Sequence, residues 1–179
     1  MPTSDEGLQE RVERLERALQ EVHDDREIRD LIAKYGHLAD GGEDADFVDL
    51  WADDAVMDLS MGVTALGGWV EPQRWEGKEA IAAFIGDPDT AKKEGVFRRT
   101  VHLMDNNLII KVQGDEAVAV ANTFVLLQTE ATVLVIGGGA NRWFLRRESG
   151  RWVFVERRRR EVGNPDFGPT LLDKLEVTR

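Results

Sequence analysis

Cysteine is absent from this 179-residue chain. Its absence excludes a disulfide framework, a thiolate nucleophile and any metal site with cysteine ligands. Histidine is scarce as well: the three copies are His23, His37 and His102, and no two of them have the i, i+2 or i, i+4 spacing of a metal site. The sequence therefore predicts a site that works without a metal ion.

Long apolar runs and phosphate-binding loops are also missing. No stretch approaches the roughly 18 apolar residues that a membrane helix needs. The glycines at 137–139 are followed by neither a lysine nor the start of a helix, so they favour a β-bulge or a close backbone approach over a phosphate loop. The first residues lack the features of a signal peptide. We therefore expect a cytoplasmic protein with no organic cofactor and no membrane partner.

The charge is strongly acidic and unevenly distributed. The net charge is −11, and residues 1–60 hold 18 acidic and 6 basic residues, a net charge of −12 for that part alone. Such a surface repels phosphate backbones, which argues against a nucleic-acid partner. The run Arg157–Arg160 does not change this, because alternate side chains of a strand point to opposite faces.

The N-terminal segment carries an apolar seam. Its members follow four- and three-residue spacing with charged residues between them: Leu8, Val12, Leu15, Leu19 and Val22. The seam predicts a helical arm over residues 1–24 that packs against its own domain or against a neighbouring subunit. The polar residues at 23–25 predict a break, with Asp24 or Asp25 capping a second helix that ends at Gly41 and Gly42.

The remaining chain predicts a short helix at 47–51, a strand at 55–59, a loop or hairpin over 60–76, a helix at 77–85 and a polar loop from 87 to 95. Four β segments follow, at 97–112, 116–129, 132–147 and 151–161, separated by turn residues. Helices followed by a meander of long strands indicate an α+β fold in which a curved, mainly antiparallel sheet wraps the N-terminal helices as a cone. The predicted domain covers 25–165, and 166–179 form a tail.

Acid–base chemistry is what remains for a functional site. His102 lies in the middle of a predicted strand, on the face that also carries Thr100, Met104 and Asn106, a mixed set typical of a lined pocket. Asp40 lies where a helix ends at two glycines, and Tyr35 lies five residues before it. These residue types can take up and donate protons, whereas His23 is expected in solvent and His37 is expected to be a surface or structural residue.

Several landmarks in this order resemble the SnoaL-like branch of the nuclear transport factor 2-like superfamily. The sequence that carries the resemblance is Arg29-Asp-Leu-Ile-Ala-Lys-Tyr35-x4-Asp40, Phe47-x3-Trp51-Ala-Asp-Asp-Ala55, Trp75-Glu-Gly-Lys-x2-Ile81, Thr100-Val-His102-x3-Asn106, Gly114-Asp-Glu-Ala117 and Gly150-Arg-Trp152-x4-Arg157. The resemblance covers residues 26–162. It implies a cone-shaped sheet around helices, which agrees with the fold expected from the residue patterns.

The resemblance also implies site residues. The branch includes scytalone dehydratase and bile acid 7α-dehydratase, and more distantly ketosteroid isomerase. Lyases of the branch use an Asp–His pair as general base, and the matching positions here are Asp40 and His102, with Tyr35 as a third catalytic residue. Further positions are expected to bind substrate or line the cavity: Arg157 (or another arginine of 157–160), Asn122, Asn141, Trp51, Met57 and Trp75.

Together these observations predict a cofactor-independent lyase or isomerase, a dehydratase ahead of an isomerase, acting on an apolar small molecule of polyketide or steroid-like type. Two alternatives stay open. One is a non-catalytic small-molecule-binding protein, and the other is a structural subunit similar to the β subunits of ring-hydroxylating dioxygenases. A homo-oligomer is expected, a trimer ahead of a dimer.

Overall fold

The computed structural model describes residues 4–42, 44–59, 73–86 and 100–172. In chain order its elements are α1 (Ser4–Gly41), α2 (Asp44–Asp49), β1 (Trp51–Asp58), β2 (Arg74–Glu76), α3 (Lys78–Ile85), β3 (Thr100–Gln113), β4 (Glu116–Gln128), β5 (Val133–Glu148), β6 (Arg151–Glu161) and α4 (Phe167–Leu172). Most of the loop predicted at 60–76, the polar loop at 87–95 and the first three residues of the strand predicted at 97–112 lie outside the described residues.

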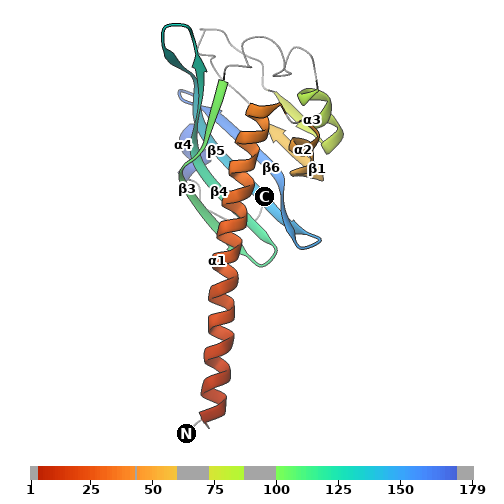
Figure 1. The fold of residues 1–179 in the computed structure, drawn as a ribbon, viewed down its shortest axis with the longest axis vertical. Helices are drawn as coiled ribbons and strands as arrows, with labels where there is room; N and C mark the ends of the chain where they lie inside the picture. The colour runs from red at the N-terminus through yellow and green to blue at the C-terminus, as the bar shows by residue number, and fades with distance from the viewer. Residues whose placement is uncertain (1–3, 43, 60–72, 87–99, 173–179) are drawn as a thin grey trace.

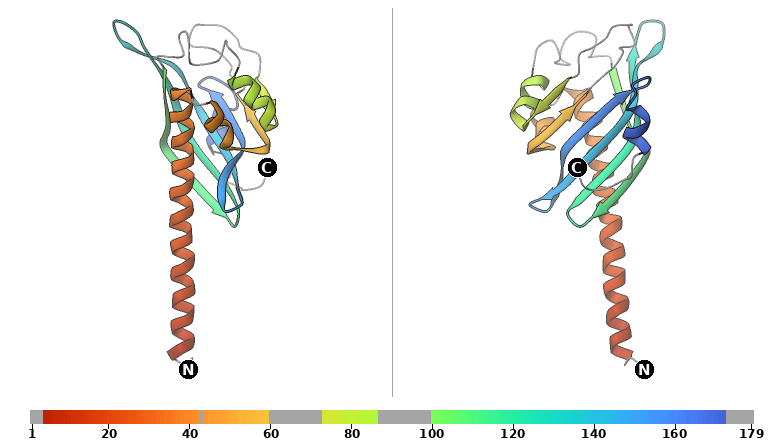
Figure 2. Two further views of the ribbon diagram at one scale, coloured as in Figure 1. Left: turned by 45° about the vertical axis from the view of Figure 1, so that its right-hand side comes forward. Right: turned by 180° about the vertical axis from the view of Figure 1, so that it is seen from behind.

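Six strands form one curved sheet in the order β2-β1-β6-β5-β4-β3. β1 and β6 pair in parallel, and every other neighbouring pair is antiparallel. The two edge strands, β2 and β3, do not pair with each other, so the sheet is open. The sheet curves along α1 on one face, while α4 lies on the other (Figures 1 and 2). The predicted α+β fold is therefore confirmed, with a mixed sheet.

The four long strands begin and end close to where the sequence predicts them. Turns at Gly114 and at Ser149–Gly150 separate them, and these three residues have positive φ angles of 62°, 50° and 83°. Glycine adopts such angles without steric cost, which is why these positions stop one strand and start the next. Short links between long strands then give the antiparallel meander.

The glycines at 137–139 lie within β5, as the bulge interpretation requires. The pairing with β4 shifts between Val125↔Gly137 and Leu126↔Val135, which leaves one extra residue on β5. At Gly139, a β-carbon would lie 2.6 Å from the backbone oxygen of Arg160, a distance that no larger residue tolerates. The prediction of a bulge and a close backbone approach is confirmed.

Helix α1 is continuous through the residues where a break was predicted, so that prediction was wrong. Asp24 does not cap a helix. It is buried, and it accepts hydrogen bonds from Gln20 on its own helix, from Arg147 on β5 and from Trp152 on β6. The polar residues that look like a break in the sequence are therefore the place where α1 is fastened to the sheet.

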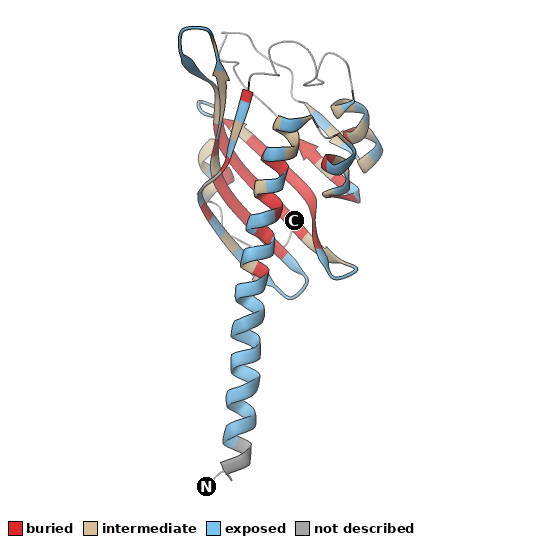
Figure 3. Cartoon of the chain, viewed as in Figure 1, coloured by how far each residue is buried: buried red, intermediate tan, exposed pale blue. Residues whose placement is uncertain are grey.

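Only the C-terminal half of α1 packs on the domain. Ile28, Leu31, Ile32 and Tyr35 are buried in the main core, whereas every residue from 7 to 23 is exposed. Figures 1 and 3 show this N-terminal half extending beyond the sheet. Of the two expected arrangements, packing against its own domain is thus wrong. Within the described residues, no helix combines the length and the apolar character needed to cross a membrane.

The core lies between the C-terminal half of α1 and the inner face of the sheet. Its centre is a group of aromatic rings with centroids 4.8–6.2 Å apart, contributed by Tyr35, Phe47, Trp51 and Phe154. Rings at these distances contact one another favourably and bury a large apolar area. Trp51 begins β1 four residues earlier than predicted, because it pairs with Phe154 of β6.

Candidate active site

The structure brings Asp40 and His102 into contact. Asp40 lies in the last turn of α1, and His102 lies near the start of β3, 62 residues later. One carboxylate oxygen, Oδ1, lies 2.7 Å from His102 Nδ1, and the other, Oδ2, accepts a hydrogen bond from the backbone N–H of His102 at 2.8 Å. We call this pair the dyad. Both side chains keep about a fifth of their surface exposed, 19% for Asp40 and 20% for His102, so solutes can reach them.

Local backbone features explain why α1 ends just after Asp40. Gly42 has a φ of 73° and its N–H donates to the backbone oxygen of Leu38 at 3.0 Å, which ends α1 directly after the aspartate. On β3, alternate residues face opposite sides: Thr100 and Met104 are buried, whereas Leu103 is exposed. This alternation turns His102 toward α1.

Gly36 is a site residue that the sequence analysis missed. A β-carbon at this position would lie 2.9 Å from Met104 Cγ and 3.8 Å from His102 Cβ. Real β-carbons essentially never approach closer than 3.0 Å. The glycine therefore lets α1 come close enough to β3 for Asp40 to reach His102. The signal in the sequence was a lone glycine inside a periodic helix, a position where glycine is unfavourable without a packing reason.

The two-point contact fixes the chemistry of the imidazole. A carboxylate can only accept hydrogen bonds, so Nδ1 of His102 carries the proton and donates it to Asp40. The other ring nitrogen, Nε2, is then the unprotonated one in the neutral imidazole and can act as a base. The bond from the backbone N–H of His102 holds the carboxylate in place. Rotation of the ring would therefore break the hydrogen bond between Nδ1 and Asp40.

A second polar group lies deeper between α1 and the sheet. Arg157 on β6 donates from Nη1 to the hydroxyl oxygen of Tyr35 and from Nε to Oδ1 of Asn141 at 2.8 Å. Asn141 in turn donates to Thr123 at 2.5 Å. The guanidinium also lies 4.5 Å from the centroid of the Tyr35 ring. Of the predicted site residues, the structure thus brings Tyr35, Asn141 and Arg157 together.

Arg157 is a buried cation without an acidic partner. Only 4% of its surface is exposed, both of its hydrogen-bond partners are neutral, and the structure shows no carboxylate paired with it in the described part of the chain. Burial lowers the pKa of Arg157 to about 10, although its interaction with Tyr35 opposes this, and the nearby charge of Arg159 lowers the pKa further. The group therefore offers an uncompensated positive charge beside the Tyr35 hydroxyl.

The four consecutive arginines of β6 separate onto two faces. Arg157 and Arg159 are buried on the inner side, where Arg159 lies 3.3 Å from Glu161. Burial lowers the pKa of Arg159 and raises that of Glu161, while the attraction between the two opposes both changes. Of the four arginines at 157–160, Arg157 and Arg159 therefore face inward.

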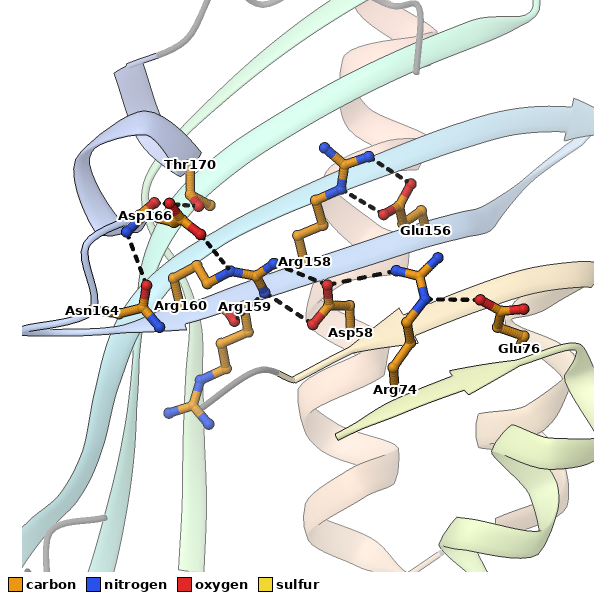
Figure 4. A network of polar contacts seen from close by, with 10 residues as sticks. All are labelled: Asp58, Arg74, Glu76, Glu156, Arg158, Arg159, Arg160, Asn164, Asp166 and Thr170. Carbon is orange, nitrogen blue, oxygen red and sulfur yellow. Dashed lines mark hydrogen bonds and ion pairs between the residues drawn. The ribbon is translucent and has the colours of Figure 1, made fainter. Parts of the chain in front are cut away.

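The other two arginines belong to a polar network on the outer face (Figure 4). Arg160 forms a two-point ion pair with Asp58 at 3.0 and 2.9 Å, and Arg158 pairs with Glu156 at 2.5 and 3.1 Å. Arg74 of β2 joins the network through Asp58 and Glu76. These charges fasten β1, β2 and β6 together and take no part in the dyad.

The remaining predicted site residues lie away from the dyad. Asn122 sits on β4 between Ala121 and Thr123 and so faces the opposite side of the sheet from Thr123. Trp51 and Met57 are 1% and 0% exposed in the core, and Trp75 packs on Phe84 with ring centroids 3.9 Å apart. The structure does not bring these four positions to the dyad. Within the described ranges, no group of three or more His, Asp or Glu side chains could hold a metal ion.

Solved structures with the same fold place this geometry in context. A nuclear transport factor 2-like protein with a cystatin-like fold from Novosphingobium aromaticivorans is 28% identical, with a TM-score of 0.74, over 88% of this chain and 94% of that one. The β subunit of a putative aromatic-ring-hydroxylating dioxygenase from the same organism is 18% identical, with a TM-score of 0.59, over 76% and 87% of the two chains. Aln2 from a Streptomyces species is 20% identical, with a TM-score of 0.60, over 75% and 88%.

A family model, and no single curated protein, identifies the family of this chain. None of the curated proteins compared with this chain matches it. The SnoaL-like domain family matches residues 20–158, a range that begins within α1 and includes Tyr35, Asp40, His102 and Arg157. The fold agrees, with an open curved sheet and one long helix on its inner face. This chain belongs to the SnoaL-like domain family.

Proposed function

We propose that this protein is a cofactor-independent lyase or isomerase, a dehydratase ahead of an isomerase, that acts on a largely apolar small molecule. One observation carries the proposal: Asp40 holds His102 at two points, at 2.7 and 2.8 Å, in a place that stays partly exposed. A surface ion pair has no need of such a fixed tautomer, whereas a general base does.

The proposed reaction begins at His102. Its Nε2 takes a proton from a carbon next to a carbonyl, and Asp40 stabilises the imidazolium that forms. The electrons of the C–H bond form the new C=C bond as the C–O bond to the leaving hydroxyl breaks. The hydroxide takes a proton and departs as water. For an isomerase, the same proton would return to a different carbon.

Tyr35 is suited to supply that proton. Its oxygen accepts a hydrogen bond from Arg157, so its own O–H is left to donate to the substrate. The adjacent buried cation stabilises negative charge that develops near the hydroxyl. Tyr35 and Asp40 lie about 7.5 Å apart along the axis of α1, so the same stretch of helix carries the proposed acid and the carboxylate that holds the base. After turnover, the proton on His102 returns to Tyr35 through solvent.

Proton abstraction can be tested before the natural substrate is known. Apolar cyclic ketones incubated in D₂O with the protein would exchange the hydrogens next to the carbonyl, and NMR would follow the loss of signal. We expect His102→Gln and Asp40→Asn each to slow the protein-catalysed exchange by about 10²–10⁴. The double variant should be no slower than the worse single variant, because the two residues act as one unit.

The matched control is His37→Gln, which removes an exposed histidine from the same helix. It should exchange at the wild-type rate. Dialysis against a chelator should also leave the rate unchanged, since the proposal needs no metal. Wild-type exchange no faster than buffer, or His102→Gln exchange at the full rate, would refute the proposed base.

A non-catalytic role is the second candidate, and the packed aromatic centre favours it. Trp51 and Phe47 are each 1% exposed, and their rings pack against the ring of Tyr35. A binding protein or a structural subunit would need this filling and no proton transfer. Fluorescence titration with the same ketones separates the cases: ligand binding that is equal in wild type and in both dyad variants, without exchange, would support a binder.

A further inference from the structure

The N-terminal half of α1 carries an apolar stripe that stays exposed in the described part of the chain. Its five members are between 43% and 65% exposed: Leu8, Val12, Leu15, Leu19 and Val22. Figure 3 shows residues 7–23 of this half in the pale blue of exposed residues. We call these five residues the seam. Their four- and three-residue spacing is that of the a and d positions of a coiled coil, with Val12 and Leu19 at a.

The seam points away from the domain. Successive residues of a helix are rotated by about 100°. On this basis the seam centres roughly 180° around α1 from Ile28, Leu31 and Tyr35, the residues that pack into the core. A partner helix can therefore lie along the seam without meeting the sheet. The outward face then becomes charged and exposed at Arg26 and Asp30, which ends the apolar stretch.

The helix itself is well supported in this segment. Glu10 and Arg14, and likewise Glu13 and Arg17, are four residues apart with the acid first, the order that stabilises a helix. Gln9 also donates to Glu13 at 3.4 Å. These charges lie off the seam, so they support the single helix and leave its apolar face for a partner.

We propose that the seam pairs with the same seam of a second copy of this chain, in parallel and in register. The flanking charges carry the choice of partner and direction. In a parallel pair, each g residue faces the e residue of the next heptad on the other helix. Here Arg11 at g would face Glu16 at e of the second copy, and the symmetric contact would form as well.

An antiparallel pair lacks this complementarity. Centring the two seams on Leu15 would place Glu16 beside Glu16 of the second copy and Arg11 beside Ala18. Like charges repel, and the arginine gains no acid. The valine at one a position with leucine at the following d position further favours two strands. Two heptads are short for a free coiled coil, so the contact belongs to the full chain and not to an isolated peptide.

Charge exchange in the full-length protein tests the pairing. Sedimentation equilibrium should give a dimer for wild type, and Arg11→Glu should weaken the association at least tenfold, because the new glutamate would then face Glu16. The double change Arg11→Glu with Glu16→Arg should restore it, since the charges are exchanged and the net charge is that of wild type. Neither residue has an opposite charge three or four residues away in its own helix, so the folded domain should keep its circular dichroism spectrum.

Cysteine crosslinking tests the direction, since the chain has no cysteine of its own. Val22→Cys should form a disulfide-linked dimer on mild oxidation, because residue 22 faces residue 22 only in a parallel pair. Arg17→Cys, on the opposite side of the helix, is the control and should not. A wild-type monomer at micromolar concentration, an Arg11→Glu variant that associates normally, or crosslinking only between mixed Leu8→Cys and Val22→Cys chains would overturn the proposal. A parallel trimer would overturn the two-stranded arrangement.

Discussion

Replacing Arg157 with methionine should leave the free energy of unfolding within about 1 kcal/mol of wild type. The change removes a buried charge, which is unfavourable, and it also removes the favourable contacts that this charge makes. Methionine has a similar length and no charge. The buried guanidinium has neutral partners only, so no carboxylate loses its counterion in this variant. Activity should nevertheless fall, since Tyr35 loses the cationic neighbour at its hydroxyl.

The magnitude follows from the pKa. The lowering of the pKa of Arg157 from the value of an exposed arginine to about 10 corresponds to about 3 kcal/mol that burial costs the charged form. Against this, the variant loses two hydrogen bonds worth about 1 kcal/mol each and a cation–π contact of about 1 kcal/mol. The terms nearly cancel. For a base with a lowered pKa, the unfolded chain binds more protons between the folded pKa of about 10 and the higher pKa of an exposed arginine, so stability rises with pH only in that interval. At pH 7 the full penalty is present.

Arg158→Met is the matched comparison on the same strand. Its partner Glu156 is only 4% exposed, so losing the arginine takes both hydrogen bonds of Arg158 from a buried carboxylate and should cost about 2 kcal/mol. Urea unfolding at pH 7, with unchanged m values, measures both variants. Exchange activity should drop for Arg157→Met and persist for Arg158→Met. The reasoning fails if Arg157→Met is the less stable of the two.

Two further substitutions test how α1 is positioned. Gly36→Ala should lower exchange activity about tenfold, because its β-carbon would lie 2.9 Å from Met104 Cγ and push Asp40 off His102; adding Met104→Ala should recover part of the loss, and no effect in the single variant would contradict the packing argument. Asp24→Asn should cost about 2 kcal/mol at neutral pH. Burial raises the pKa of Asp24, but hydrogen bonds from its three donors lower it below the usual 3.8 overall. This stabilisation is present above pH 3.8 and is lost as the pH falls through the folded pKa, so unfolding curves of wild type and variant should converge in acid and stay apart at pH 7.

The sheet could be predicted from the sequence because its signals are local. Each long strand alternates or is rich in β-formers, and turn residues with positive φ separate most of them. The helix end at Gly42 is local in the same way. The dyad could be expected only with the help of the family resemblance, because the residue pattern supplies a carboxylate at that helix end and a histidine on a strand but does not pair them. What the strand pattern could not supply is the 2.8 Å bond to the backbone of His102.

The features that escaped the sequence depend on distant partners. Asp24 looked like a cap, but its buried position depends on Arg147, 123 residues away. Gly36 depends on Met104, which lies far along the sequence, beyond β1 and α3. The orientation of Arg157 depends on an irregularity earlier in β6. The pairing with β5 shifts between Phe144↔Glu156 and Leu145↔Phe154, so Val155 is extra and all later residues change face.

Helix α1 joins these features in one continuous helix, with the two proposed roles on different halves of it. Its C-terminal half carries Tyr35, Gly36 and Asp40 into the domain, and its N-terminal half carries the seam on the opposite face. Asp24 lies between the halves and is fastened to both β5 and β6. Because that anchor holds the helix before it leaves the sheet, forces from a partner at the seam would reach the anchor first. A helix with these two faces can support association and a precisely held dyad without making one depend on the other.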